Sequence, residues 1–172
     1  MAFLGKRNGA AVLLVFAFAC PLWMASASGR DGAPLPRASA RAAASVEASI
    51  RGCANRQRES RGLRELQHDS ALDRAAELHA RRMLAKGFFD HQDPAGDGPA
   101  DRVKRYAKRR YVIIGENIAA GYESVGAACR EWMNSPEHRE NILRSRFTRI
   151  GAGYASGSRH YGRYYVQVFA DA

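Results

Sequence analysis

The chain has 172 residues, which is enough for one domain with a hydrophobic core. Its 27 lysines and arginines outnumber the 17 aspartates and glutamates, so the formal net charge is +10. Such a surface suits an anionic partner, but no nucleic-acid-binding motif accompanies the charge, so we expect no nucleic-acid partner.

The first 27 residues have the features of an export signal. Lys6 and Arg7 precede the apolar run AAVLLVFAFACPLWM, and the small residues ASAS follow it. This order predicts a secretory signal peptide over 1–27, cleaved after Ala27, because the apolar run is too short for a membrane span. Lipidation at Cys20 and an uncleaved anchor are the alternatives. We therefore expect a secreted protein, periplasmic or extracellular, with no transmembrane segment after cleavage.

Residues 28–43 contain little to bury and predict a flexible linker. The domain is expected over 44–172 and begins with two helices. In the first helix an apolar stripe recurs at helical spacing, and Gly62 follows the stripe. In the second helix Asp69 or Ser70 caps the start and Gly87 marks the end. The buried face of this second helix is expected to hold Leu72, Ala75, Ala76, His79 and Met83.

The middle of the chain alternates loops with short elements. FFDHQDPAGDGP reads as a loop, and a short basic helix follows over 99–109. YVII, bounded by Gly115, indicates a strand or an extended connection. SVGAACREWM predicts a helix, and SPEHRENIL begins another, with Ser135 as the N-cap and Pro136 as the first helical residue.

The end of the chain changes its period from helical to alternating. FTRIGAGYA and RYYVQVFA alternate and are rich in aromatic and β-branched residues, and SGSRHYG between them holds turn residues. This pattern predicts a hairpin of two strands. Helices first and strands last indicate a layered α+β domain.

Two cysteines remain once the predicted signal is removed. An even number of cysteines in an exported chain favours a disulfide between Cys53 and Cys129. The alternative is a pair of buried free thiols.

Three residues are candidates for chemistry. His91 opens the turn-rich loop, where functional side chains concentrate; the alternative is a histidine that bonds the backbone. Glu116 stands in an apolar run, so it must be paired, bonded or on the wall of a cleft. His138 is the third residue of its helix, where the positive helix terminus favours the neutral imidazole that binds metals. Two histidines and a carboxylate are sufficient ligands for zinc or another divalent cation. His79 is expected to be a core residue, and His68 and His160 to be exposed.

The order of several segments resembles the CAP superfamily, which comprises cysteine-rich secretory proteins, antigen 5 and pathogenesis-related 1. The chain is most similar to the bacterial single-domain SCP-like form. The segments are SALDRAAELHARRM, GFFDH, GENIAAG, EWMNSPEHRENIL, FTRIGAGYA and YYVQVFA. The resemblance implies a three-layer α-β-α sandwich in which His91, Glu116 and His138 meet in a cleft that holds a divalent metal in some relatives. The usual second glutamate of the family, three residues after the tryptophan, is here Ser135.

The resemblance implies an extracellular binding or signalling module that is not an enzyme. Its expected ligands are a lipid, a sterol, a cell-wall fragment or a protein, and its charge also suits an anionic surface. Arginine outnumbers lysine along the whole chain, which suggests that the basic charge reflects the general amino-acid composition of the genome and not a dedicated basic binding patch. The first alternative is a metal-dependent hydrolase in which His91 and His138 hold zinc and Glu116 is either a further ligand or the base that activates water. The second is a structural envelope protein.

Overall fold

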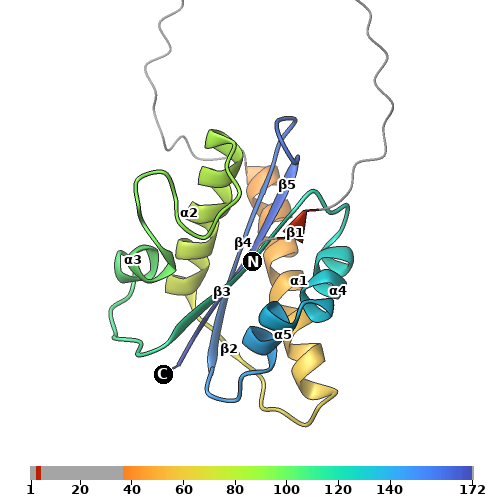
Figure 1. Cartoon of the computed structure of the whole chain (residues 1–172), viewed down its shortest axis with the longest axis vertical. Coiled ribbons are helices and arrows are strands. Elements are labelled where there is room, and N and C mark those ends of the chain that lie inside the picture. Colours follow the sequence, from red (N-terminus) through yellow and green to blue (C-terminus); the bar gives the residue numbers. More distant parts are fainter. Residues whose placement is uncertain (1–2, 5–36, 172) are drawn as a thin grey trace, which may run out of the picture.

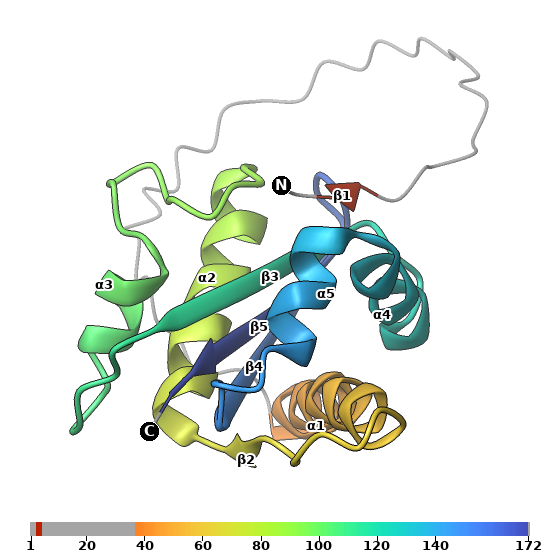
Figure 2. The same ribbon diagram turned by 60° about the horizontal axis from the view of Figure 1, so that its bottom comes forward.

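A mixed β-sheet lies between two layers of helices. A computed structural model describes residues 3–4 and 37–171. In it α2 and α3 cover one face of the sheet, and α1, α4 and α5 cover the other (Figures 1 and 2). This arrangement confirms the predicted α-β-α sandwich.

The sheet joins short and long strands in the order β1-β3-β5-β4-β2. β3 and β4 each pair antiparallel with β5, while β1 and β2 add in parallel at the two edges. The strands are β1 (Phe3–Leu4), β2 (Gln67–His68), β3 (Ile114–Ala120), β4 (Arg149–Ser156) and β5 (Arg163–Ala170). The predicted C-terminal hairpin is therefore confirmed as β4 and β5.

Four of the five helices begin close to where the sequence predicts them. The helices are α1 (Arg37–Glu59), α2 (Ser70–Lys86), α3 (Pro99–Lys104), α4 (Val125–Asn134) and α5 (Pro136–Leu143). The Asp69 side chain accepts a hydrogen bond from the Ala71 amide at 2.9 Å, and Gly87 ends α2 with a φ of 71°. Both predicted ends of α2 are thereby confirmed.

Three boundaries differ from the prediction. α1 begins at Arg37, inside the predicted linker, while residues 28–36 and the predicted signal and lipidation site lie outside the described residues, apart from β1. α3 ends at Lys104, and the Tyr106 amide then donates to the Val103 carbonyl in a tightened last turn, so the helix is shorter than the predicted 99–109. β3 begins at Ile114 and includes Gly115, so the glycine does not bound the strand.

α2 packs tightly on the sheet because β4 lacks side chains where the helix crosses it. A Cβ added at Gly151 would collide with the backbone at Leu72, and one added at Gly153 with the backbone at Ala76. The glycines thus let the helix approach the strand backbone closely. His79, on the same helix, is consequently held against the sheet and fully buried.

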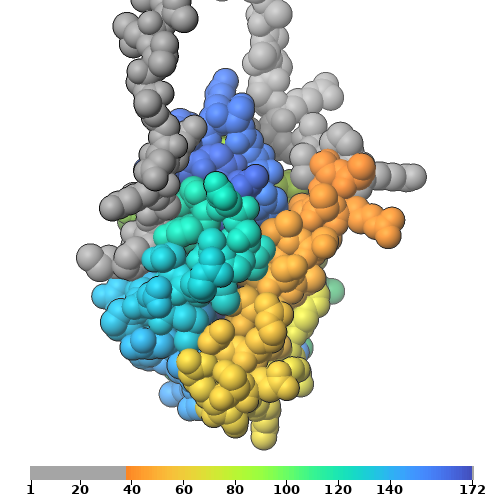
Figure 3. All heavy atoms as spheres, turned by 90° about the vertical axis from the view of Figure 1, so that its right-hand side faces the viewer, coloured from red at the N-terminus to blue at the C-terminus, as the bar shows by residue number. Residues whose placement is uncertain are grey.

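On the opposite face, a disulfide joins α1 to α4. Cys53 and Cys129 are linked, with their Cα atoms 6.4 Å apart, which confirms the predicted bridge. Figure 3 shows α1 lying alongside the α4–α5 segment. In the chain-entropy model a loop of this length contributes about 4 kcal/mol. Within residues 37–171, no helix is long and apolar enough to cross a membrane.

Candidate functional site

Glu116 lies on β3 with its side chain almost fully buried. Strand alternation turns its carboxylate toward α2 and α3. Arg102 of α3 donates from Nη2 to both carboxylate oxygens, at 3.0 Å to Oε1 and 2.8 Å to Oε2. The guanidinium is itself fully buried. This buried ion pair is the centre of the site.

Two histidines complete what we call the Glu116 cluster: His79, His91, Arg102 and Glu116. His91 donates from Nδ1 to Glu116 Oε1 at 2.9 Å. His79 donates from Nε2 to the Asp90 carbonyl at 2.9 Å, and the same nitrogen is 3.7 Å from Glu116 Oε1. The side chain of His91 is 34% exposed whereas that of His79 is 0% exposed. The cluster therefore reaches solvent through His91.

Burial and charge fix the protonation states at the centre of this cluster. Burial opposes ionisation of Glu116, but the hydrogen bond from His91 and the charge and hydrogen bonds of Arg102 outweigh it, so its pKa lies below the usual value. Burial lowers the pKa of His79 to about 4, although Glu116 opposes the shift. At neutral pH the cluster thus holds an ionised Glu116 and a neutral His79.

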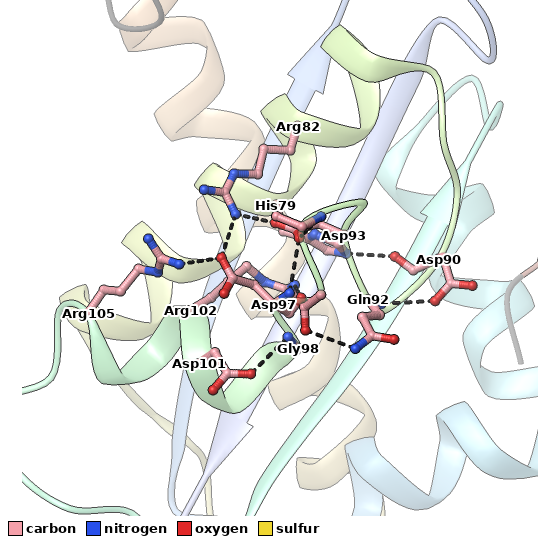
Figure 4. Close-up of polar contacts among 12 residues, drawn as sticks. His79, Arg82, Asp90, Gln92, Asp93, Asp97, Gly98, Asp101, Arg102 and Arg105 are labelled. Atoms are coloured by element: carbon pink, nitrogen blue, oxygen red, sulfur yellow. Dashed lines mark hydrogen bonds and ion pairs between the residues drawn. The ribbon is translucent and has the colours of Figure 1, made fainter.

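Arginines also hold the loop that carries His91. Arg102 donates from Nη1 to the Asp97 carbonyl at 2.7 Å and from Nη2 to the His91 carbonyl at 3.0 Å. Arg82 of α2 pairs with Asp93 and Asp97 (Figure 4). The loop is thereby tied to α2, α3 and β3, which fixes the position of the His91 ring.

His138 is placed by α5, which is anchored at both ends. Ser135 is its N-cap and Pro136 its first residue, as predicted, although the Ser135 side chain makes no capping hydrogen bond. At the other end, the buried Arg58 of α1 donates to the carbonyls of Ile142 and Arg144 at 2.9 and 3.0 Å.

α5 is also bonded to the strand that carries Glu116. Asn117 donates to the His138 carbonyl at 3.0 Å. This bond lies on the opposite sheet face from the Glu116 side chain, since neighbouring strand residues alternate. The meeting of His138 with His91 and Glu116 in one cleft stays a prediction.

Of the residues predicted to bind a metal, Glu116 is poorly suited to be a ligand. Both oxygens of Glu116 accept from Arg102, and a guanidinium beside a cation site would repel the metal. Among the residues that the structure describes, no three His, Cys, Asp or Glu side chains form a group that could hold a metal ion. Glu116 instead fits the role of the carboxylate that orients His91 through Nδ1. Metal binding by His91 and His138 stays a prediction.

Sequence reasoning found two members of the cluster and missed the other two as functional residues. His79 is buried as predicted, but it also lies beside Glu116. Arg102 was expected only as part of a short basic helix. The sequence did not predict its burial, because Arg102 is the first of several basic residues in this segment and nothing in the pattern distinguishes it from the others. The isolated Glu116 was the available signal, since a buried carboxylate requires a cationic partner.

Comparison with known proteins identifies relatives for most of the described domain. The model of the cysteine-rich secretory protein family (CAP) matches residues 52–169. The Bacillus subtilis protein YkwD is 42% identical over 105 residues, covering 60% of this chain and 40% of YkwD. The Bacillus subtilis membrane protein YlbC is 31% identical over 108 residues, covering 63% of this chain and 29% of YlbC.

Solved structures show the same fold. An extracellular protein of Bacillus anthracis containing an SCP domain aligns with a TM-score of 0.70 and 29% identity, over 82% of this chain and 45% of that one. An outer surface protein of Borrelia burgdorferi aligns with a TM-score of 0.65 and 21% identity, over 71% of this chain and 89% of that one. The chain spans less than half of YkwD, YlbC and the Bacillus anthracis protein.

Proposed function

Because the chain belongs to the cysteine-rich secretory protein (CAP) family, we propose that it works outside the cytoplasm as a non-catalytic binding or signalling module. The description of the Bacillus anthracis relative as an extracellular protein supports the location, as does the sequence pattern of an export signal. The proposed ligand is a lipid, a sterol, a cell-wall fragment or another protein.

The observation that carries the proposal is the state of Glu116. A carboxylate that activates water must reach that water, yet the Glu116 side chain is 1% exposed and Arg102 bonds both of its oxygens. The ion pair also lowers the proton affinity of Glu116, which weakens it as a base. In this arrangement Glu116 serves to hold Arg102 and His91, and recognition is left to the surface around them.

One experiment separates a binding role from a catalytic one. Purified protein would be incubated with peptide and ester substrates at pH 7.5, with and without added zinc. His91→Ala serves as the matched variant, because His91 is the exposed member of the cluster. We expect the same background rate from both proteins. Hydrolysis that disappears in His91→Ala would overturn the proposal.

A metal-dependent hydrolase is the second candidate, and one contact favours it. His91 donates through Nδ1 to Glu116 at 2.9 Å, and the ring is partly exposed. A carboxylate that orients a histidine in this way is part of many general-base and metal sites. Zinc calorimetry above pH 7, where histidines are neutral, tests it directly: binding that is lost in both His91→Ala and His138→Ala would support this candidate.

A further inference from the structure

α3 and the turn after it enclose an apolar pocket outside the Glu116 cluster. The pocket has a volume of about 560 Å³. Ala100, Val103 and Ala107 line it at helical spacing, and Tyr111 and Ile114 close it from the segment that leads into β3. Val103 belongs to the hydrophobic core beneath α2, and Ala107, Tyr111 and Ile114 pack against that core. The volume lies within the range of roughly 300–1,000 Å³ that is usual for small-molecule sites.

The rim of this pocket is cationic. Lys104, Lys108, Arg109 and Arg110 line it together with the apolar residues. Within the described part of the chain, Lys104, Lys108 and Arg110 form no ion pair, whereas Arg105, which does not line the pocket, pairs with Asp97. The charges of Lys104, Lys108 and Arg110 are therefore left uncompensated by the protein, whereas Arg109 lies close enough to Asp69 to lower the pKa of that carboxyl. The three uncompensated charges favour an anion at the mouth of the pocket.

A second, polar pocket of about 480 Å³ adjoins the apolar one. The two share Lys108, Arg109 and Tyr111. The second pocket adds the cations Arg74 and Arg149 and one carboxylate, Asp69, so cations outnumber the acid in its lining. Tyr111 is held between them because its hydroxyl donates to Asp69 at 2.6 Å. An apolar compartment and a basic compartment thus lie side by side with a fixed tyrosine between them.

We propose that this pair of pockets binds an anionic amphiphile. Its hydrocarbon chain would enter the pocket beneath α3, and its phosphate or carboxylate head would lie on Lys108 and Arg109. The apolar lining disfavours a free inorganic anion as the sole ligand, since burial of hydrocarbon supplies no affinity to such an ion. The uncompensated charges disfavour an uncharged lipid. The inference rests on the proposed binding role and names the ligand class, at a site distinct from the Glu116 cluster.

Three probes separate the contributions of the hydrocarbon tail and of the charged head. Decyl phosphate, used below its critical micelle concentration, has both a tail and a charge. Inorganic phosphate has only the charge, and decyl maltoside has the tail without a charge. Binding would be measured by calorimetry and by amide shifts in NMR spectra. We expect decyl phosphate to bind at least about tenfold more tightly than either of the others, because charge-assisted contacts add to hydrocarbon burial. Equal affinity for decyl maltoside, or for inorganic phosphate, would overturn the proposal.

Variants locate the site. Lys108→Glu/Arg110→Glu reverses two exposed rim charges, and Ala107→Trp fills the apolar pocket. Each should weaken decyl phosphate binding by about tenfold or more. The matched control is Arg41→Glu/Arg130→Glu, which makes the same charge change at exposed positions on α1 and α4, and it should bind normally. Unchanged binding in the rim variant, or equal loss in the control, would show that the site lies elsewhere.

Vesicles with anionic lipid distinguish the pocket from simple adsorption to a charged surface. If the protein binds such vesicles but not monomeric decyl phosphate, the pocket proposal is wrong and the basic surface alone is responsible. Hydrolytic activity at the Glu116 cluster would contradict the non-catalytic proposal without changing the decyl phosphate result. The two failures are therefore distinguishable.

Discussion

Arg102 uses a single nitrogen, Nη2, to bond both carboxylate oxygens of Glu116, where neither side chain is exposed beyond 1%. The other nitrogen of the fork, Nη1, bonds the Asp97 carbonyl. One buried cation therefore joins α3, the loop before it and β3. The pair has more than an electrostatic role, because its backbone bonds place the loop on which His91 stands.

Replacing Arg102 with Met should lower the free energy of unfolding by about 3 to 5 kcal/mol, since it leaves Glu116 charged and buried without a partner. The double variant Arg102→Met/Glu116→Gln should recover part of this loss because it removes the stranded charge. Chemical denaturation at pH 7 measures both.

The control is Arg105→Met, which breaks an exposed ion pair with Asp97 and should cost less than about 1 kcal/mol. If Arg102→Met behaves like this control, the buried pair does not hold the loop. If the double variant is no more stable than Arg102→Met, the loss comes from the backbone bonds of Arg102 and not from the stranded carboxylate.

The sequence predicted the parts of the fold that depend on local pattern. The α2 face and its caps at Asp69 and Gly87 follow from helical periodicity and from backbone chemistry within a few residues. The C-terminal hairpin follows from alternation. The order of strands in the sheet was not predicted from pattern, because pairing joins residues far apart in the chain, such as Glu116 and Val168.

The candidate site was predictable only as a set of unusual residues. Glu116 was conspicuous because it interrupts an apolar run, and His91 because it opens a loop. Arg102 gave no such signal, since its neighbours Lys104 and Arg105 are equally basic but exposed. Which of these cations is buried depends on how α3 is docked, and that is a tertiary property.

Acid should destabilise the fold through His79. Burial lowers the pKa of His79 in the folded protein to about 4, from an ordinary value of 6.5. The unfolded chain therefore binds a proton at a pH where the folded protein does not, and stability is lost as pH falls from about 6.5 to 4. By linkage this loss is about 3 kcal/mol.

His79→Gln keeps a donor for the Asp90 carbonyl and removes the titration. Its unfolding free energy should no longer fall as pH drops through the same window, and only the opposite, smaller effect of Glu47 should remain, measured by denaturant titration at half-unit steps. His160→Asn is the matched control, because His160 is exposed and its φ of 53° is one that asparagine tolerates. The control should retain the full pH dependence. A steep dependence that survives in His79→Gln would assign the acid transition to another group.

Gly153→Ala tests the close approach of α2 to the sheet. The new methyl group would overlap the backbone of Ala76 and Glu77, so the helix must move away from β4. We expect a loss of about 3 kcal/mol in unfolding free energy. Gly126→Ala is the control, because its Cβ meets no atom closer than 3.6 Å. It should be neutral or stabilising by up to about 1 kcal/mol. A Gly153→Ala protein as stable as this control would show that the approach is not tight.

Glu47 should weaken the fold at alkaline pH. Burial, followed by the charges of Glu77 and Asp73, raises its pKa to about 7 from an ordinary value of 4.5. The folded protein therefore holds a proton that the unfolded chain releases. The associated stability is fully present below pH 4.5 and is lost as pH rises through about 7.

Glu47→Gln removes a charge that burial and the neighbouring carboxylates disfavour, so it should raise the unfolding free energy at pH 8 and leave it unchanged at pH 4. Because the side chain is only half-buried, solvent screening limits the gain to on the order of 1 kcal/mol. Glu59→Gln makes the same chemical change at an exposed position of α1 and should have no effect at either pH. Thermal unfolding at the two pH values compares them. A gain of equal size at pH 4, or in Glu59→Gln, would show that helix propensity or net charge is responsible, and not the burial and repulsion of the Glu47 charge.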